Sequence, residues 1–96
     1  MSAYFIARVK VTDREQYKKY LKAVPAVIEK YNGKAIARSE KCISLEGPEE
    51  TRRNIIIEFP SVEKAREFYN SQEYTEVKKL RANAADGEII VVEGVK

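Results

Sequence analysis

The stretch RRNIIIEFPSVEKAREFYNSQEY, Arg52 to Tyr74, contains a strand and a helix separated by two residues. Ile55, Ile56 and Ile57, followed by Phe59, form an apolar, β-branched run of strand length, which is typical of a strand covered on both faces. Pro60 ends this strand. Ser61 then stands at a helix N-cap, and apolar residues follow it at helical spacing. The stretch therefore predicts a buried strand that leads directly into an amphipathic helix.

The composition is that of a globular protein, with 96 residues of which 44% are apolar and 34% charged. A chain of this length has room for one hydrophobic core, so we expect a single domain over residues 1–96. No apolar run reaches the length of a signal peptide or a membrane span. The single cysteine, Cys42, excludes an internal disulfide. We expect a cytoplasmic protein that does not bind membranes.

Charge and residue usage limit the classes of function further. The 18 basic and 15 acidic residues leave a charge of +3 that is spread along the chain, which is a weak indication of nucleic-acid binding. Histidine, the commonest metal ligand and general base, is absent. The glycines are too far apart for a phosphate-binding or dinucleotide-binding loop. We expect no metal and no cofactor.

The first half of the chain predicts a strand, a helix and a second strand. Apolar residues alternate from Ala3 to Val11, and Thr12 and Glu15 stand at capping-box spacing before a long amphipathic helix. Pro25 predicts a kink in that helix or two helical pieces. The second strand begins near Lys34, with Ile36 and Arg38 on one face. We expect it to resume from Cys42 to Leu45.

The second half adds a short helix and a last strand after the opening stretch. Ser71 is placed to cap a third helix that contains Tyr74 and Arg81, and Asp86-Gly87 is expected to end it. Glu88 to Glu93 is the last strand and is apolar on both faces. The order is βαββαβ with a helical extension.

This order predicts an α+β, ferredoxin-like fold, in which a four-stranded antiparallel sheet carries helices on one face. Because two of the strands are apolar on both faces, the open face needs a second cover. A second copy of the chain is the simplest cover, and two sheets packed face to face would form a dimeric α/β barrel. The same order serves RNA-recognition domains, but the third strand lacks their glycine and stacking aromatic residues, so nucleic acid is not an expected partner.

Residues along nearly the whole chain resemble the bacterial domain-of-unknown-function family thirteen-thirty. The resemblance rests on the order and spacing of Tyr17, Tyr20, Pro25, Asn32-Gly33-Lys34, Arg38, Leu45-Glu46-Gly47, Arg53, Phe59-Pro60-Ser61, Ala65, Tyr69, Ser71-Gln72-Glu73-Tyr74, Arg81 and Val92-Glu93-Gly94. Relatives often carry a glycine pair where this chain has Ser39-Glu40. Any close backbone approach to a ligand that uses those glycines is therefore not expected here.

The resemblance implies membership of the dimeric α/β-barrel superfamily, with muconolactone isomerase, cofactor-free antibiotic-biosynthesis monooxygenases and stress-responsive barrel proteins. It implies a homodimer with a pocket in each subunit for a small anionic or aromatic molecule. One hypothesis is a cofactor-free isomerase or monooxygenase. The alternative is a non-catalytic small-ligand-binding or stress-associated dimer.

The candidate ligand-binding residues are mainly arginines. Arg38, Arg53 and Arg81 match the family pattern, and guanidinium groups bind carboxylate or phosphate bidentately. Alternatively, they are surface charges or ion-pair partners of Glu46 and Glu58. Glu46 is also a candidate for the ligand site.

The candidate catalytic residues are Glu58, Tyr74 and Arg38. Glu58 interrupts an apolar strand, so it is either a general base with a shifted pKa or one half of an interfacial ion pair. Tyr74 follows a helix cap and is the tyrosine that we expect in the site. Tyr17 and Tyr20 stand at helical spacing, and we expect them to be half-buried core residues.

Overall fold

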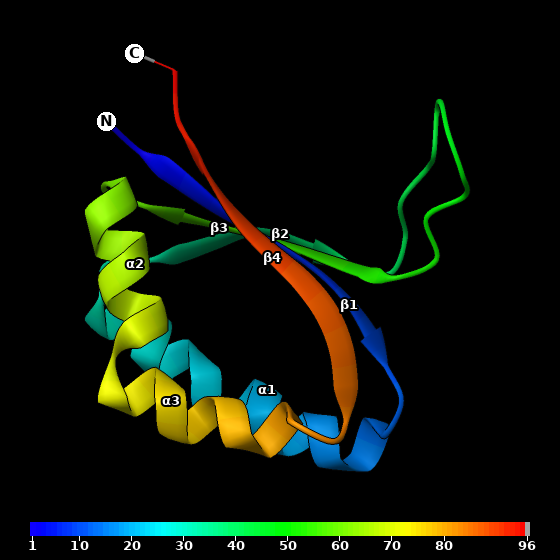
Figure 1. The fold of residues 1–96 in the computed structure, drawn as a ribbon, viewed down its shortest axis with the longest axis horizontal. Coiled ribbons are helices and arrows are strands. Elements are labelled where there is room, and N and C mark those ends of the chain that lie inside the picture. The colour runs from blue at the N-terminus through cyan, green and yellow to red at the C-terminus, as the bar shows by residue number, and fades with distance from the viewer. Residues whose placement is uncertain (96) are drawn as a thin grey trace.

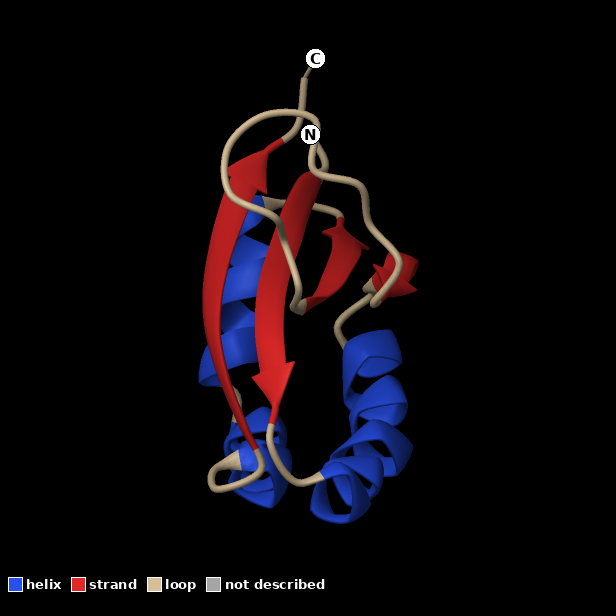
Figure 2. Ribbon diagram, turned by 90° about the vertical axis from the view of Figure 1, so that its right-hand side faces the viewer, coloured by secondary structure: helices blue, strands red, loops and turns tan. Residues whose placement is uncertain are grey.

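The computed structural model describes residues 1–95 and contains one sheet with its helices on one face (Figure 1, Figure 2). The elements in chain order are β1 (Ala3–Val11), α1 (Arg14–Lys30), β2 (Lys34–Ser39), β3 (Arg53–Phe59), α2 (Val62–Asn70), α3 (Gln72–Lys78), the 3-10 helix η1 (Lys79–Arg81) and β4 (Ala85–Glu93). The four strands pair antiparallel in the order β2-β3-β1-β4. The predicted α+β, ferredoxin-like fold is confirmed.

The core lies between the sheet and the helices. Alternate residues of β1, from Ala3 to Val9, are at most 5% exposed and face the helices, as the alternation predicts. Phe68 of α2 packs against this face, with ring centroids 5.6 Å from Phe5 and 4.6 Å from Tyr74. These aromatic contacts join β1, α2 and α3 into one apolar layer.

Helix α1 starts at a different N-cap from the one predicted, and Pro25 does not divide it into two pieces. Its N-cap is Asp13 and not Thr12, because the Asp13 carboxylate accepts a hydrogen bond from the Gln16 amide at 3.1 Å. Pro25 lies inside one continuous helix. Val24 and Val27 on either side of Pro25 are both buried, and this packing offsets the cost of about 3 kcal/mol that a proline imposes on a helix.

Strand β2 is shorter than expected and contains a bulge. It ends at Ser39, and the predicted continuation from Cys42 to Leu45 is wrong, because Leu45 lies 90% exposed in the loop that projects from the sheet in Figure 1. In the ladder, Ala35 pairs with Ile57 and Ala37 with Ile56, so Ile36 is an extra residue. Arg38 therefore shares the helix-facing side with Ala35, not with Ile36 as the alternation predicted.

Strand β4 begins earlier than predicted, at Ala85. The Thr12 and Asp13 amides both donate to the Ala84 carbonyl, at 2.7 and 3.0 Å, and the β1–β4 ladder starts next to this junction. The helical segment consequently ends at Arg81, and Gly87 lies within the strand. A Cβ at Gly87 would come within 2.7 Å of the Arg8 carbonyl oxygen, so the strands approach closely here.

The other side of the sheet carries no helix and is called the open face. Its residues include Tyr4, Ile6, Ile56, Glu58, Ile90 and Val92, which follow from the strand register. Ile90 is 53% and Val92 44% exposed. The open face is thus a partly apolar surface that the described residues leave uncovered.

Candidate functional site

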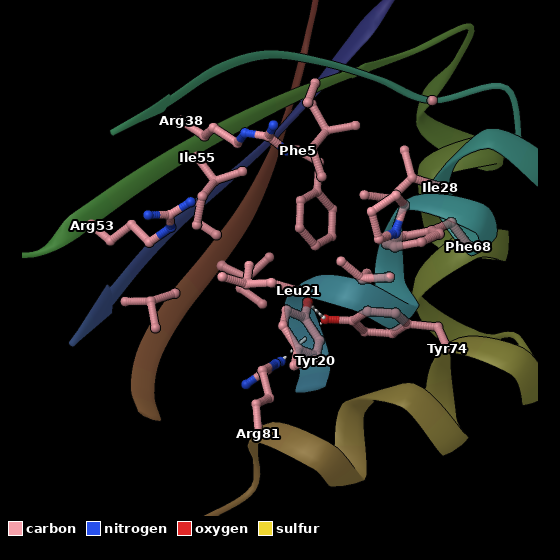
Figure 3. A pocket seen from close by; sticks show the side chains of 18 of the residues that line it. Phe5, Tyr20, Leu21, Ile28, Arg38, Arg53, Ile55, Phe68, Tyr74 and Arg81 are labelled. Carbon is pink, nitrogen blue, oxygen red and sulfur yellow. Dashed lines mark hydrogen bonds between the residues drawn. The ribbon is translucent and has the colours of Figure 1, made fainter. Parts of the chain in front are cut away.

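A cavity of about 560 Å³ lies between the helix-facing side of the sheet and helices α1 and α3 (Figure 3). This volume is within the usual range for small-molecule sites, about 300 to 1,000 Å³. Its walls are mainly apolar and aromatic, and its lining includes Phe5, Leu21, Ile28, Ile55 and Phe68. The polar groups in the lining come from two separate places, the sheet and the helices.

On the sheet side, Arg38 and Arg53 point into the cavity from β2 and β3. Arg38 pairs in register with Ile55, two residues beyond Arg53, so the two arginines are diagonal neighbours on one face. Side chains at such positions start about 7 to 8 Å apart, within reach of one shared ligand. Arg38 takes this orientation because its partner in the ladder is Ile55, and the bulge at Ile36 accommodates that register.

Arg53 has an unsatisfied donor. Its Nε atom is buried and has no hydrogen-bond partner within the described part of the chain. Leaving a buried donor unpaired costs about 1 to 3 kcal/mol, so such groups are rare and often mark a place where something else binds.

On the helix side, Tyr20, Tyr74 and Arg81 form a hydrogen-bonded cluster. The Tyr20 and Tyr74 hydroxyl oxygens are 2.9 Å apart, and Arg81 Nη2 donates to the Tyr74 hydroxyl at 3.3 Å. The Arg81 guanidinium also lies over the Tyr20 ring, 5.6 Å from its centroid. Figure 3 shows the three side chains meeting at the wall formed by α1, α3 and η1.

The chain places Tyr74 by a helix cap. The Ser71 hydroxyl accepts from the Tyr74 amide at 3.0 Å and donates to the Phe68 carbonyl at 2.7 Å, which confirms the predicted cap. Ser71 thereby ends α2 and starts α3. The sharp junction turns the Tyr74 ring, which is 1% exposed, toward α1.

The Tyr20 hydroxyl stays protonated near neutral pH. Burial raises the pKa of the Tyr20 phenol, and the neighbouring Tyr74 hydroxyl raises it further. Burial also raises the pKa of Tyr17, which lines the same cavity. These phenols therefore stay protonated and do not serve as bases.

The acidic candidates lie elsewhere. Glu58 is on the open face, where its carboxylate accepts from the Tyr4 hydroxyl at 3.4 Å, and Glu46 is exposed in the loop after β2. Glu58 is therefore separated from the cavity by the sheet and cannot act there as a general base. Glu29, at an exposed position of α1, is the one carboxylate among the described lining residues.

The three candidate arginines have no carboxylate partner within the part of the chain that the structure describes. Within one chain neither Glu46 nor Glu58 forms an ion pair with Arg38, Arg53 or Arg81, and Arg38 stands at an exposed position, so the interpretation as a surface charge stays open for Arg38. The structure brings these arginines and Tyr74 together around one cavity, and their role in ligand binding stays a prediction.

Sequence reasoning undervalued Tyr20. Its helical spacing with Tyr17 is explained by the core, where Tyr17 is 4% exposed, and the rings are 5.4 Å apart. Tyr20 also hydrogen-bonds to Tyr74, 54 positions away. The sign in the sequence of a polar cluster at this wall was Arg81, whose guanidinium lies over the Tyr20 ring.

The described residues give little support for a metal site or a membrane span. No three or more acidic or cysteine side chains among residues 1–95 are arranged to hold a metal ion. Across the same residues, every helix is too short or too polar to cross a membrane. A second hollow of about 510 Å³, between α2 and β4, shares Phe5, Arg81 and Ile89 with the first.

A family model described as "Domain of unknown function (DUF1330)" matches residues 2–95. The chain belongs to this family. The family resemblance inferred from the sequence is thereby confirmed, and the family description assigns no activity. No curated protein matches the chain.

Solved structures share the fold of this DUF1330 protein at low sequence identity. A protein of unknown function from Rhodopseudomonas palustris is 24% identical with a TM-score of 0.76, over 99% of this chain and 83% of that one. SnoaB, a cofactor-independent oxygenase from Streptomyces nogalater, is 9% identical with a TM-score of 0.70, over 99% and 94%. A dimeric protein of unknown function and ferredoxin-like fold from Bacteroides fragilis is 14% identical with a TM-score of 0.64, over 97% and 96%.

Proposed function

We propose that this DUF1330 protein binds a small organic anion with an apolar or aromatic body in the cavity between the sheet and helices α1 and α3. The observation that carries the proposal is the set of three arginines, Arg38, Arg53 and Arg81, that line an apolar cavity without a carboxylate partner among residues 1–95. Arg53 and Arg81 are partly buried and Arg38 is exposed at the rim, and a partly desolvated guanidinium forms stronger charge-assisted hydrogen bonds to carboxylate than one in bulk water.

The test is a titration of the purified protein with benzoate, 2-naphthoate and their uncharged amides. We expect the carboxylates to raise the melting temperature, because a ligand bound only by the folded state stabilises it, and the amides to have little effect. Arg53→Gln should weaken carboxylate binding about tenfold or more, the loss of one hydrogen bond to a charged group.

Arg14→Gln is the matched control, since it removes the same charge from an exposed position of α1 outside the cavity. Its carboxylate affinity should equal that of the unsubstituted protein. Equal affinities for carboxylate and amide, or equal losses in Arg14→Gln and Arg53→Gln, would contradict anion binding in the cavity.

A catalytic form of the proposal is a cofactor-free isomerase or monooxygenase. The cluster of Tyr20, Tyr74 and Arg81 supports it, because fixed donors of this kind stabilise negative charge that develops on a substrate oxygen. SnoaB, which shares the fold, is described as a cofactor-independent oxygenase. The alternative is a non-catalytic dimer that binds a ligand in the same cavity without converting it.

Turnover separates the two forms. A bound carboxylate that is recovered unchanged after prolonged incubation in air supports the binding protein. Depletion of the ligand that is lost in Tyr74→Phe, with binding retained, supports the enzyme. The cytoplasmic location predicted from composition stays part of the proposal.

The open face is the proposed interface of a homodimer. Its exposed apolar residues, including Ile90 at 53% and Val92 at 44%, support this, and the Bacteroides fragilis neighbour is described as dimeric. Sedimentation equilibrium at micromolar concentration should give twice the chain mass. Ile90→Glu should weaken the dimer, whereas Ala26→Glu, which adds the same charge to an exposed position of α1, should not. A monomer in all three proteins would contradict the interface.

A further inference from the structure

The hydroxyl pair of Tyr20 and Tyr74 carries one proton more than the described residues accept. Each phenol has one proton to donate, and the bond between the two oxygens uses one of them. Arg81 only donates to Tyr74, so it takes up no proton. Within the described residues, neither hydroxyl has another acceptor. In either orientation of the shared bond, one phenolic proton of this part-buried pair has no acceptor among the described residues and is free to bond to a ligand in the cavity.

The cavity therefore has two groups of donors. The sheet donor group consists of Arg38 and Arg53, and the helix donor group consists of Tyr20, Tyr74 and Arg81. Figure 3 shows the two groups on different walls of the cavity. A single oxyanion at one group leaves the other group without an acceptor.

Acceptors are scarce on the protein side. Glu29 is the only lining carboxylate among residues 1–95, and its position is exposed. The buried Nε of Arg53 and the spare phenolic proton both lack a partner in the described chain. Because unpaired buried donors are costly, a well-matched ligand supplies acceptors to both groups.

We propose that the ligand is an aromatic carboxylate with a second oxygen acceptor on the far side of its ring system, either a carbonyl or a second carboxylate. The carboxylate meets the sheet donor group, where neither guanidinium group has a carboxylate partner among residues 1–95. The second acceptor meets the helix donor group, where Arg81 is already partly engaged by a neutral hydroxyl. This inference rests on the proposed function and adds the second recognition point.

The test compares ligands that differ only in the second acceptor. Benzoate, 4-acetylbenzoate and terephthalate form a one-ring series, and 2-naphthoate and naphthalene-2,6-dicarboxylate form a longer one. Calorimetric titration should show that, in one series at least, the second acceptor strengthens binding about tenfold or more, as expected for one charge-assisted hydrogen bond.

Variants then assign that gain to the helix donor group. Tyr74→Phe and Arg81→Gln should reduce the ratio between the two-acceptor and one-acceptor ligands toward one, because they should weaken the two-acceptor ligands more than benzoate or 2-naphthoate. Arg53→Gln should weaken all ligands equally and keep the ratio. Phenylalanine retains the ring that packs on Phe68, so Tyr74→Phe keeps the buried contacts, and its melting temperature verifies the fold.

The outcomes separate this inference from the proposed function. Binding of the simple carboxylates that depends on Arg53, with a ratio of one in both series, would overturn the second recognition point and leave the anion site intact. A ratio that Tyr74→Phe and Arg81→Gln do not change would also overturn it. If no carboxylate binds at all, the proposed function fails together with the inference.

Discussion

Arg52 and Arg53 are neighbours in the chain and have opposite surroundings. The Arg52 guanidinium bonds to the Glu50 carboxylate through Nε at 2.8 Å and to the Glu88 carboxylate through Nη1 at 2.6 Å. Arg53 points into the cavity, where its buried Nε has no partner among residues 1–95. The paired arginine anchors the loop after β2 to the sheet. The buried Nε of Arg53 has no hydrogen-bond partner in the described chain, which is the pattern expected of a ligand-binding residue.

The same contrast extends to the two faces of the sheet. On the open face, Arg8 also has a carboxylate nearby, with its Nε 3.8 Å from Glu50. On the helix-facing side, Arg38 and Arg53 line the mainly apolar cavity and form no ion pair among residues 1–95. Arginines of the open face therefore have carboxylate partners within the described chain, and those of the cavity do not.

The largest expected effect comes from comparing substitutions at Ile57 and Ile56, which are adjacent residues on opposite faces of the sheet. Ile57 is 4% exposed under the helices, so Ile57→Ala should lower the free energy of unfolding by about 2 to 5 kcal/mol. Ile56→Ala removes the same atoms from the open face. In urea denaturation, its cost should be smaller at low protein concentration and grow as the concentration rises, because the proposed dimer buries it. A cost independent of concentration would contradict that burial.

Arg53→Met should stabilise the ligand-free protein by about 1 kcal/mol, because it removes an unsatisfied buried donor and a positive charge next to Arg38. Arg52→Met should instead destabilise the protein by at most about 1 kcal/mol, the value of an exposed ion pair. Urea denaturation without ligand measures both. If both variants lose stability equally, Arg53 has a structural partner and the contrast fails.

Ser71→Ala should lower the free energy of unfolding by about 1 kcal/mol, the usual value of a helix N-cap. Because the Ser71 hydroxyl holds the Tyr74 amide, the variant should also weaken the preference for ligands with a second acceptor. Ser61→Ala removes an equivalent cap, that of α2, which accepts from the Lys64 amide. It should cost similar stability and leave ligand preference unchanged.

The smallest effect concerns acid stability. Hydrogen bonds from Arg52 lower the pKa of Glu50 from 4.5 to about 2. A carboxylate with a depressed folded-state pKa stabilises the protein above its unfolded pKa and loses that contribution as the pH falls through the folded pKa. The melting temperatures of the protein and of Glu50→Gln should therefore converge between pH 4.5 and about 2. A constant difference across this range would contradict the pairing.

Periodicity predicted most of the fold, since the alternation in β1 and the helical spacing of α2 reflect burial on one side. Other features depend on geometry that periodicity does not encode. Thr12 and Asp13 are both good caps, and the bonds of both amides to the Ala84 carbonyl decide between them. Glu58 looked catalytic because it interrupts an apolar strand, yet its strand face places it away from the cavity.

Only part of the candidate site could be predicted from the sequence, because periodicity does not encode bulges or the packing of helices. Arg53 and Arg81 reach the cavity from regular elements, whereas Arg38 reaches it through a bulge that no residue type announces. The hydrogen bond between Tyr20 and Tyr74 joins α1 to α3, and such pairings across the fold depend on how the helices pack.

The bulge at Ile36 has a consequence for comparing and engineering DUF1330 chains. Ala35 and Arg38 keep the same face whether or not the extra residue is present, because each is fixed by its own partner on β3. A chain that lacks Ile36 would form a regular ladder and still direct its arginine into the cavity. The orientation of Arg38 is thus determined by its pairing with β3 and not by its distance in sequence from the turn after α1. Length changes in that turn are thereby separated from the site, and an aligned arginine one position away can be the equivalent residue.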